Sequence, residues 1–189
     1  MRKSVFLLFL PIIFTWVANY DSKGHPLTLT ISTDSKMYFV GDTIKITYEW
    51  ENISEKEVRF IAIPKQYTFG KSWIRVYDTS GKEMERKEFP LEKEKSFGEE
   101  ALLSLKPNEK YARTLEVRVR ENLPAIDYSG LCLDFGDSAI LLAGYGKYRL
   151  KADLEFPFGW YYEDGTRIFV RGLWQGVLNS NETTIKIMG

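Results

Sequence analysis

Hydrophobic and polar side chains alternate along much of this chain, and the alternation is clearest over residues 43–52. There Ile44, Ile46, Tyr48 and Trp50 occupy every second position, and charged or hydroxyl residues lie between them. Successive side chains of a β-strand point to opposite faces of its sheet. The stretch therefore predicts a strand with one buried and one solvated face.

Similar apolar stretches recur between turns rich in glycine, proline and asparagine, which predicts further short strands. The expected strands are Leu27–Ser32, Thr43–Asn52, Glu57–Ile63, Ser72–Asp78, Ala101–Leu105, Tyr111–Val119, Gly146–Phe156 and Thr183–Ile187. Glu83–Phe89 is expected to pair back on Ser72–Asp78 as a hairpin, and Ser138–Ala143 is either one helical turn or a buried strand. No helix longer than two turns and no fixed-period repeat is predicted. Strands at this spacing are typical of a β-sandwich or barrel.

Two segments interrupt this rhythm and are expected to be inserted loops. Leu91–Phe97 is highly charged, and Glu121–Asp137 contains a proline, two glycines and three aspartates. Residues 27–189, with these loops inserted, are expected to form one domain.

The N-terminus has the pattern of a secretory signal. Arg2 and Lys3 precede an apolar run from Val5 to Ala18, which is shorter than the about 20 residues of a membrane-spanning helix. Residues 1–18 are thus expected to be a signal peptide cleaved after Ala18 or an uncleaved N-terminal anchor. The expected location is extracytoplasmic, either secreted or at the cell envelope.

Charge and cysteine content narrow the function classes. Removal of residues 1–18 leaves 171 residues (189 − 18), with 24 basic and 26 acidic side chains and a net charge of −2. No basic stripe stands out, so nucleic acid is not an expected partner. Cys132 is the only cysteine and lies between two leucines, which favours a buried, unpaired thiol.

The two ends of the mature chain resemble a known group of proteins. The opening pattern is Leu27-x-Leu29-x-Ile31, Tyr38-x-x-Gly41-Asp42-x-Ile44-x-Ile46 and Asn52-x-Ser54. The closing pattern is Gly146-x-Tyr148-x-Leu150-x-Ala152, Leu173-Trp174-x-Gly176-x-Leu178-x-Ser180-Asn181 and Ile185-x-Ile187. Both resemble secreted bacterial immunoglobulin-like domains, including the BsuPI-type proteinase-inhibitor domain. The resemblance implies an immunoglobulin-like antiparallel β-sandwich.

Two residues of these patterns have expected roles of their own. Tyr148 follows Gly146 at the start of a late strand, where its ring can enter the core while its hydroxyl bonds a nearby backbone group. Gly176 suits a bulge or a close approach of the backbone.

No catalytic or metal-binding signature stands out. His25 is the only histidine and lies far from Cys132 in the sequence, so we expect no nucleophile pair. Asp127, Asp134 and Asp137 could converge on a calcium ion, but their spacing does not match an EF-hand loop. No carboxylate pair is singled out for glycoside hydrolysis. We expect neither catalysis nor a cofactor.

The segment Phe156–Tyr162 is the main binding candidate. Five of its seven residues are aromatic, namely Phe156, Phe158, Trp160, Tyr161 and Tyr162, and Pro157 and Gly159 interrupt any regular strand. A turn at Glu163-Asp164-Gly165 then leads into Thr166–Val170. Aromatic loop side chains can anchor a protein partner or stack on a sugar. Alternatively, the rings close the end of the sandwich.

The sequence thus predicts an exported, non-enzymatic interaction module that binds a protein partner through loops. One alternative is a proteinase inhibitor that presents Lys65–Lys71 or Glu121–Asp137 to a protease. Another is a carbohydrate-binding accessory module that depends on Trp160, and a structural spacer is a third possibility.

Overall fold

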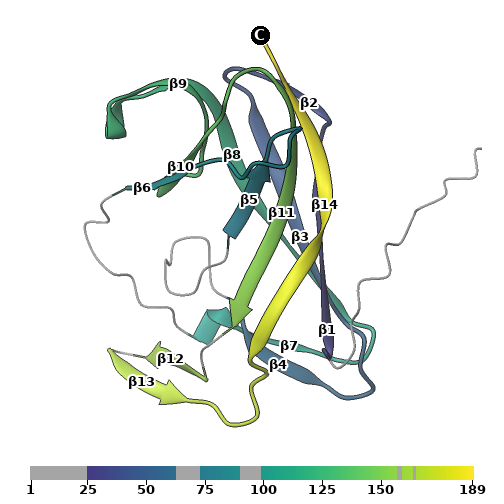
Figure 1. Cartoon of the computed structure of the whole chain (residues 1–189). Helices are drawn as coiled ribbons and strands as arrows, with labels where there is room; N and C mark the ends of the chain where they lie inside the picture. Colours follow the sequence, from purple (N-terminus) through teal and green to yellow (C-terminus); the bar gives the residue numbers. More distant parts are fainter. Residues whose placement is uncertain (1–24, 63–72, 90–98, 157–158, 164) are drawn as a thin grey trace, which may run out of the picture.

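The described chain is built almost entirely of β-strands (Figure 1). The computed structural model describes residues 25–62, 73–89, 99–156, 159–163 and 165–189. Within these ranges the helical segments are two short 3-10 turns, η1 (Glu99–Ala101) and η2 (Pro124–Ile126). No helix with the length and hydrophobicity of a membrane span occurs among the described residues. The predicted signal segment, residues 1–18, lies outside them.

Two large β-sheets form the layers of a sandwich. The six-stranded sheet has the order β1 (Leu27–Thr33), β3 (Thr43–Asn52), β8 (Lys110–Leu123), β9 (Tyr128–Asp134), β10 (Ser138–Leu141) and β6 (Arg86–Glu88). The four-stranded sheet has the order β2 (Met37–Phe39), β14 (Gly176–Met188), β11 (Gly146–Phe156) and β5 (Trp73–Tyr77). Neighbouring strands are antiparallel except β2 and β14, which run parallel.

The connections between the layers are those of an immunoglobulin-like sandwich. β1 and β2 are consecutive in the chain but lie in different sheets, so the chain changes layer between them. β3 pairs with β8, and β11 lies between β5 and β14, so strands far apart in the sequence are neighbours. The predicted fold class, all-β and immunoglobulin-like, is therefore confirmed.

Two smaller sheets lie at one end of the sandwich (Figure 1). One pairs β4 (Val58–Ile61) with β7 (Leu102–Leu105), and the other pairs β12 (Trp160–Glu163) with β13 (Thr166–Phe169).

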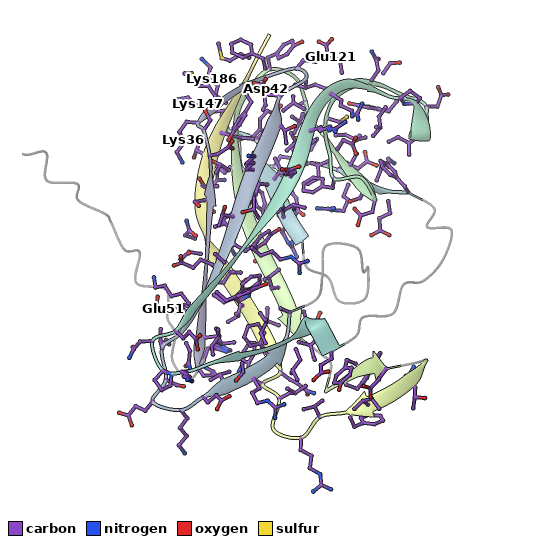
Figure 2. All side chains as sticks on the ribbon, turned by 180° about the vertical axis from the view of Figure 1, so that it is seen from behind. Lys36, Asp42, Glu51, Glu121, Lys147 and Lys186 are labelled. Atoms are coloured by element: carbon purple, nitrogen blue, oxygen red, sulfur yellow. The ribbon has the colours of Figure 1, made fainter. Side chains whose placement is uncertain are left out.

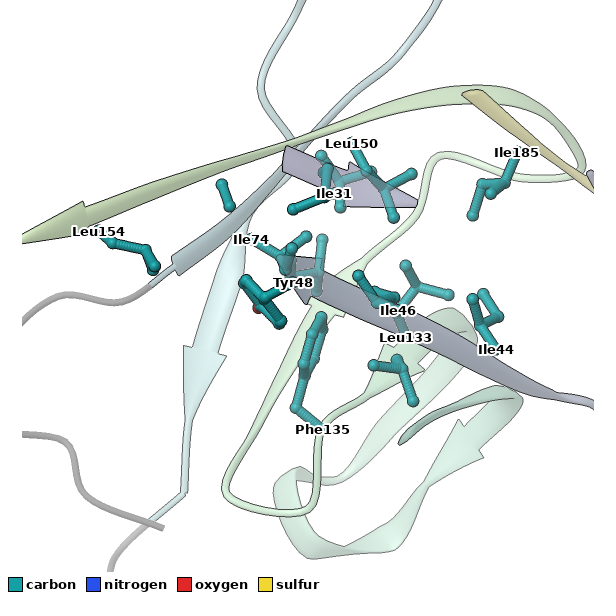
Figure 3. Close-up of a cluster of buried hydrophobic side chains, with 14 of the residues drawn as sticks. Ile31, Ile44, Ile46, Tyr48, Ile74, Leu133, Phe135, Leu150, Leu154 and Ile185 are labelled. Atoms are coloured by element: carbon teal, nitrogen blue, oxygen red, sulfur yellow. The ribbon is translucent and has the colours of Figure 1, made fainter. Parts of the chain in front are cut away.

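The alternating side chains of the two sheets meet in one core (Figure 3). In β3, Ile44, Ile46, Tyr48 and Trp50 are all buried, as their spacing predicts. They face side chains such as Leu150 of the four-stranded sheet. Burial of this apolar surface is the main favourable contribution to folding.

Tyr148 adopts the position expected from the sequence. Its ring is buried, and its hydroxyl donates a hydrogen bond to the backbone oxygen of Gly144 at 2.6 Å. The same hydroxyl accepts a bond from the Gly144 backbone nitrogen at 3.2 Å. This contact fixes the turn that leads into β11, as a tyrosine corner does in immunoglobulin-like domains.

A bulge in β14 joins the two sheets along one side of the sandwich. Ala152 of β11 faces both Ser180 and Asn181, because the register shifts by one residue there. The Ser180 hydroxyl accepts the Ala152 backbone N–H at 2.8 Å. The Asn181 amide then reaches β1, where its oxygen accepts the Ile31 N–H at 2.7 Å and its nitrogen donates to the Ile31 oxygen at 3.0 Å. Asn181 thus takes the place of a neighbouring strand for β1.

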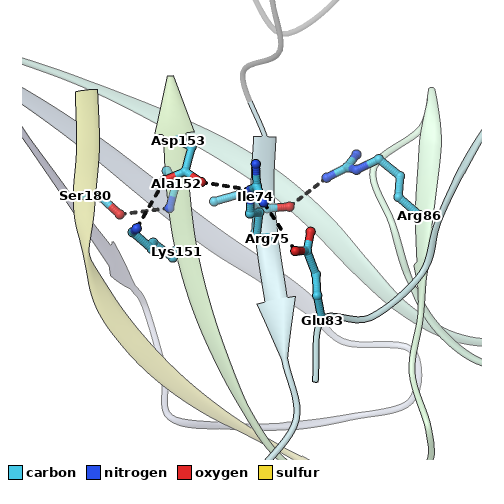
Figure 4. A network of polar contacts seen from close by, with 8 residues as sticks. All are labelled: Ile74, Arg75, Glu83, Arg86, Lys151, Ala152, Asp153 and Ser180. Atoms are coloured by element: carbon cyan, nitrogen blue, oxygen red, sulfur yellow. Dashed lines mark hydrogen bonds and ion pairs between the residues drawn. The ribbon is translucent and has the colours of Figure 1, made fainter. Parts of the chain in front are cut away.

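Arg86 joins the sheets on the other side (Figure 4). Its guanidinium donates to the backbone oxygen of Ile74 in β5 at 2.8 Å and to the hydroxyl of Ser138 in β10 at 2.7 Å. The guanidinium carbon also lies 5.0 Å from the centre of the Phe135 ring.

Several predicted elements differ from the observed ones. Glu121–Asp137 is not an irregular loop, because the end of β8, η2 and β9 fill most of it. The hairpin expected for Glu83–Phe89 is reduced to a single bridge between Tyr77 and Glu83, after which β6 pairs with β10 of the other sheet. Ser138–Ala143 contains a strand, and the last strand begins at Gly176 instead of Thr183. Leu91–Phe97 lies outside the described residues.

Candidate functional site

The β12–β13 hairpin has one face toward the protein and one toward solvent. Tyr161 pairs with Ile168 in the centre of the hairpin, and both pack into a small core with Ile61 and Ala101. Tyr161 is only 8% exposed. Its burial raises the pKa of its phenol, and nearby carboxylates raise it further. Tyr161 therefore attaches the hairpin to the sandwich.

The outer face of the hairpin carries Trp160, Arg167 and Phe169, of which Arg167 and Phe169 are exposed and Trp160 is half-buried. Trp160 lies directly opposite Phe169 in the register, so the two side chains share a face. The Arg167 guanidinium lies over the Trp160 ring, 4.6 Å from its centre, within the range of a cation–π contact. Phe169 is 73% exposed. We call these three residues the hairpin face.

The five aromatic residues expected to form one binding loop have different environments. Phe156 ends β11, where its backbone pairs with Gly176, and Phe158 lies outside the described residues. The backbone of Tyr162 pairs with Arg167 in the hairpin. Trp160 is half-buried against the small core, and Tyr161 is inside it. The segment is thus partly a strand, and a buried Tyr161 agrees with the alternative of rings that close the end of the sandwich.

Arg167 and Phe169 were not among the predicted site residues, although a local signal for them exists. Asp164-Gly165 is a dipeptide that favours two-residue β-hairpin turns. Such a turn sets Glu163 against Thr166, and counting back along both strands places Trp160 opposite Phe169, as observed.

Trp174 and Gly176 belong to the closing sequence pattern, and their contacts fix the segment that follows the hairpin. The Trp174 backbone N–H donates to the Arg59 oxygen in β4 at 2.7 Å. A Cβ atom on Gly176 would lie 2.6 Å from the Trp174 ring, so only glycine allows the indole to lie against the backbone there. The His25 ring packs against the same indole in a T-shaped arrangement, with ring centres 6.2 Å apart.

The aspartates considered for calcium do not form a site. Both oxygens of Asp134 accept hydrogen bonds, one from Arg120 at 2.7 Å and one from the Gly136 backbone at 2.8 Å. Asp137 instead accepts a bond from Ser138. Within the described ranges, no group of three or more His, Cys, Asp or Glu side chains could hold a metal ion.

His25 and Cys132 lie in different parts of the molecule. Cys132 is fully buried with Leu123 and Ala139, whereas His25 contacts Trp174. Burial raises the pKa of the Cys132 thiol, which favours the unreactive protonated form. The expected buried cysteine is confirmed.

Neither a protein-family model nor a curated protein matches this chain. Among solved structures, 86% of the chain aligns with 15% of a β-glucosidase from Erythrobacter marinus, at 10% identity and a TM-score of 0.36. The same share aligns with 16% of an α2-macroglobulin structure from Escherichia coli, at 12% identity and a TM-score of 0.34. The PapD-like domain 7 of human CEP192 aligns over 100% of this chain and 97% of its own, at 13% identity and a TM-score of 0.27. At these scores none of the three similarities indicates an activity.

Proposed function

We propose that this chain is an exported, non-catalytic interaction domain that binds a protein partner through the hairpin face. The observation that carries the proposal is the exposure of Phe169, which at 73% exceeds that of the other exposed large hydrophobic side chains of the described chain. Exposed aromatic and arginine side chains often supply most of the energy of protein interfaces. Export is proposed from the basic and apolar pattern of residues 1–18.

The geometry around Trp160 favours a protein over a glycan. A sugar ring stacks on the open face of an aromatic side chain. In this hairpin Arg167 lies over one face of the indole, and the indole also packs against the small core. Phe169 then remains as the exposed anchor for a partner.

The resemblance to the BsuPI-type domain supports inhibition of a protease as a narrower form of the same proposal. Of the two segments considered for contact with a protease, Lys65–Lys71 lies outside the described residues. Glu121–Asp137 is mostly paired strand, which is less suited to entering a protease cleft than an extended loop. The hairpin face is therefore the contact that we propose for this alternative also.

The proposal is tested by capturing partners from a cell-envelope extract with the full chain and with Phe169→Ser. We expect the variant to lose a specific protein partner, with a free energy of unfolding within about 0.5 kcal/mol of the original, because the ring is exposed. Val177→Ser is the matched control, since Val177 is also exposed but lies on β14. It should retain the partner.

Other outcomes separate the alternatives. A captured protease that the chain inhibits would establish the inhibitor function, and retention on glycans that depends on Trp160 would establish carbohydrate binding. Equal capture by the original protein and Phe169→Ser would refute the hairpin face. Tyr161→Ala is not a suitable probe, because removing this buried ring should lower stability by about 3 kcal/mol.

A further inference from the structure

We propose that a second interaction surface lies at the other end of the sandwich and binds an acidic, partly apolar segment of a protein partner. It consists of Lys36, Met37, Phe39, Lys147 and Lys186, which we call the lysine patch. These residues come from β2, β14, β11 and the residue before β2. Figure 2 shows Lys36, Lys147 and Lys186 grouped on one side of the molecule. Because β11 runs from Gly146 near this patch to Phe156 near the hairpin, the two surfaces are at opposite ends.

The strand registers place Met37, Lys147 and Lys186 on the outer face of the four-stranded sheet, whereas the Lys36 side chain extends from the sheet edge to the buried Thr183. Met37 pairs with Lys186, and Lys186 pairs with Lys147, so the three residues form a row across three strands. The neighbouring residues Ile187 and Tyr148 are buried in the core. Since side chains alternate along a strand, Lys186 and Lys147 point to solvent.

The lysines of the patch have no carboxylate partner among the described residues. Lys36 donates to the Thr183 hydroxyl at 3.0 Å, and no ion pair includes Lys147 or Lys186. Like charges in directly opposite positions of a sheet are destabilising. The pair of Lys147 and Lys186 therefore costs stability in the isolated chain, and an acidic ligand would offset that cost.

Other cations of the same face are paired. Arg149 lies 3.0 Å from a carboxylate oxygen of Glu182, and Arg75 lies 2.8 Å from one of Asp153 (Figure 4 shows the second pair). Carboxylates of the same sheet thus neutralise Arg149 and Arg75, whereas the lysines of the patch are left for the carboxylates of a partner.

The carboxylates near the lysine patch form hydrogen bonds with groups other than its lysines. Asp42 accepts the backbone N–H of Phe39 at 2.8 Å, and Glu121 accepts a hydrogen bond from the Tyr145 hydroxyl. Tyr145 is 52% exposed, and its ring lies beside the terminal Gly189, next to the patch.

Apolar side chains beside the lysines provide contact area. Met37 is 60% exposed and Phe39 is 54% exposed, and both lie on β2. Methionine and aromatic side chains are enriched in protein interfaces, where charged groups form the rim. A partner that carries both carboxylates and apolar side chains complements this combination.

The partner must bind to the face of the sheet and not to its edge. The outward backbone groups of β2 are already bonded within the chain. The Met37 N–H and oxygen both bond the Ser35 hydroxyl, at 3.2 and 3.0 Å, and Asp42 holds the Phe39 N–H. Strand addition at β2 is therefore blocked. A second copy of the chain is also disfavoured, because a symmetric contact would bring two lysine patches together.

The proposal is tested by panning a random peptide library on the full chain and on the charge-reversed variant Lys147→Glu/Lys186→Glu. We expect acidic peptides with apolar residues to be enriched on the original protein and to bind the variant at least about tenfold more weakly. Lys56→Glu/Lys106→Glu is the matched control. It changes the net charge equally, but its exposed lysines lie in turns at the hairpin end of the sandwich. It should bind as the original does.

Two further variants test what the apolar side chains contribute to peptide binding and what the opposed lysines cost in stability. Met37→Ser/Phe39→Ser should weaken the selected peptides without any change of charge. Lys147→Glu alone should raise the melting temperature, because it turns a repulsive pair into an attractive one. A lower melting temperature would contradict the argument that the lysines cost stability.

Three outcomes would overturn the proposal: no enrichment of acidic peptides, equal binding to the charge-reversed variant, or binding to vesicles of phosphatidylserine and phosphatidylcholine in place of peptides. Phe169→Ser should leave peptide binding unchanged. The lysine patch and the hairpin face can therefore fail independently.

Discussion

At the residue scale, Asn52 has an unusually large structural role. It is fully buried, and its amide nitrogen donates to the backbone oxygens of Lys56 at 2.7 Å and Leu105 at 2.8 Å. Its amide oxygen accepts both the backbone N–H and the hydroxyl of Ser54, at 2.9 and 2.8 Å. Asn52→Ala should lower the free energy of unfolding by about 3 kcal/mol, because it leaves several buried polar groups without partners. Urea denaturation measures the change.

Asn122→Ala is the control, since Asn122 is an exposed asparagine of β8. It should change stability by less than about 0.5 kcal/mol. Equal effects of the two substitutions would show that the Asn52 bonds are not what stabilises the turn. Asn52-Ile53-Ser54 also matches a glycosylation sequence, but the buried, fully bonded amide of the folded chain is inaccessible to a glycan.

At the element scale, β1 depends on a side chain of β14. Asn181 bonds both backbone groups of Ile31, so Asn181→Ala should release the edge of β1. We expect faster hydrogen exchange at the Ile31 amide and a loss of about 1–2 kcal/mol of stability. Asn179→Ala provides the comparison, because Asn179 lies on the same strand and is exposed. Unchanged exchange at Ile31 in Asn181→Ala would contradict this role of the bulge.

At the scale of the whole molecule, the described part of the chain has one large core and two small ones, one under the hairpin and one around Cys132. The large core lies between the two main sheets, whereas the core under the hairpin contains the buried residues Ile61, Ala101 and Tyr161. A unit with little buried apolar surface opens at low free energy. Native-state hydrogen exchange should therefore show β12 and β13 opening before β3 and β11. Opening of all four strands at one free energy would mean that the hairpin and the sandwich unfold as a single unit.

The sequence by itself determined the elements whose patterns are local. The bounds of β3 and β11 were predicted as observed, because a period of two is readable along a single strand. The roles of Tyr148 and Gly176 were also predictable, since each depends on residues close by in the chain. Such signals predict a β-sandwich or barrel, and the immunoglobulin-like topology was implied by the resemblance of the two ends of the chain.

Only the tertiary structure decided which distant segments became neighbours. Nothing local to β6 indicates that it leaves β5 to pair with β10, and nothing local to Lys147 places Lys186 opposite it. The same holds for Tyr161, whose burial depends on Ile61 and Ala101 of other elements. Strand pairing across sheets depends on the simultaneous burial of many side chains, so it is a property of the whole chain and not of any one segment. For that reason the sequence indicated an aromatic binding segment, whereas the structure buries Tyr161 of that segment, leaves Trp160 half-buried and exposes Phe169 of the next strand.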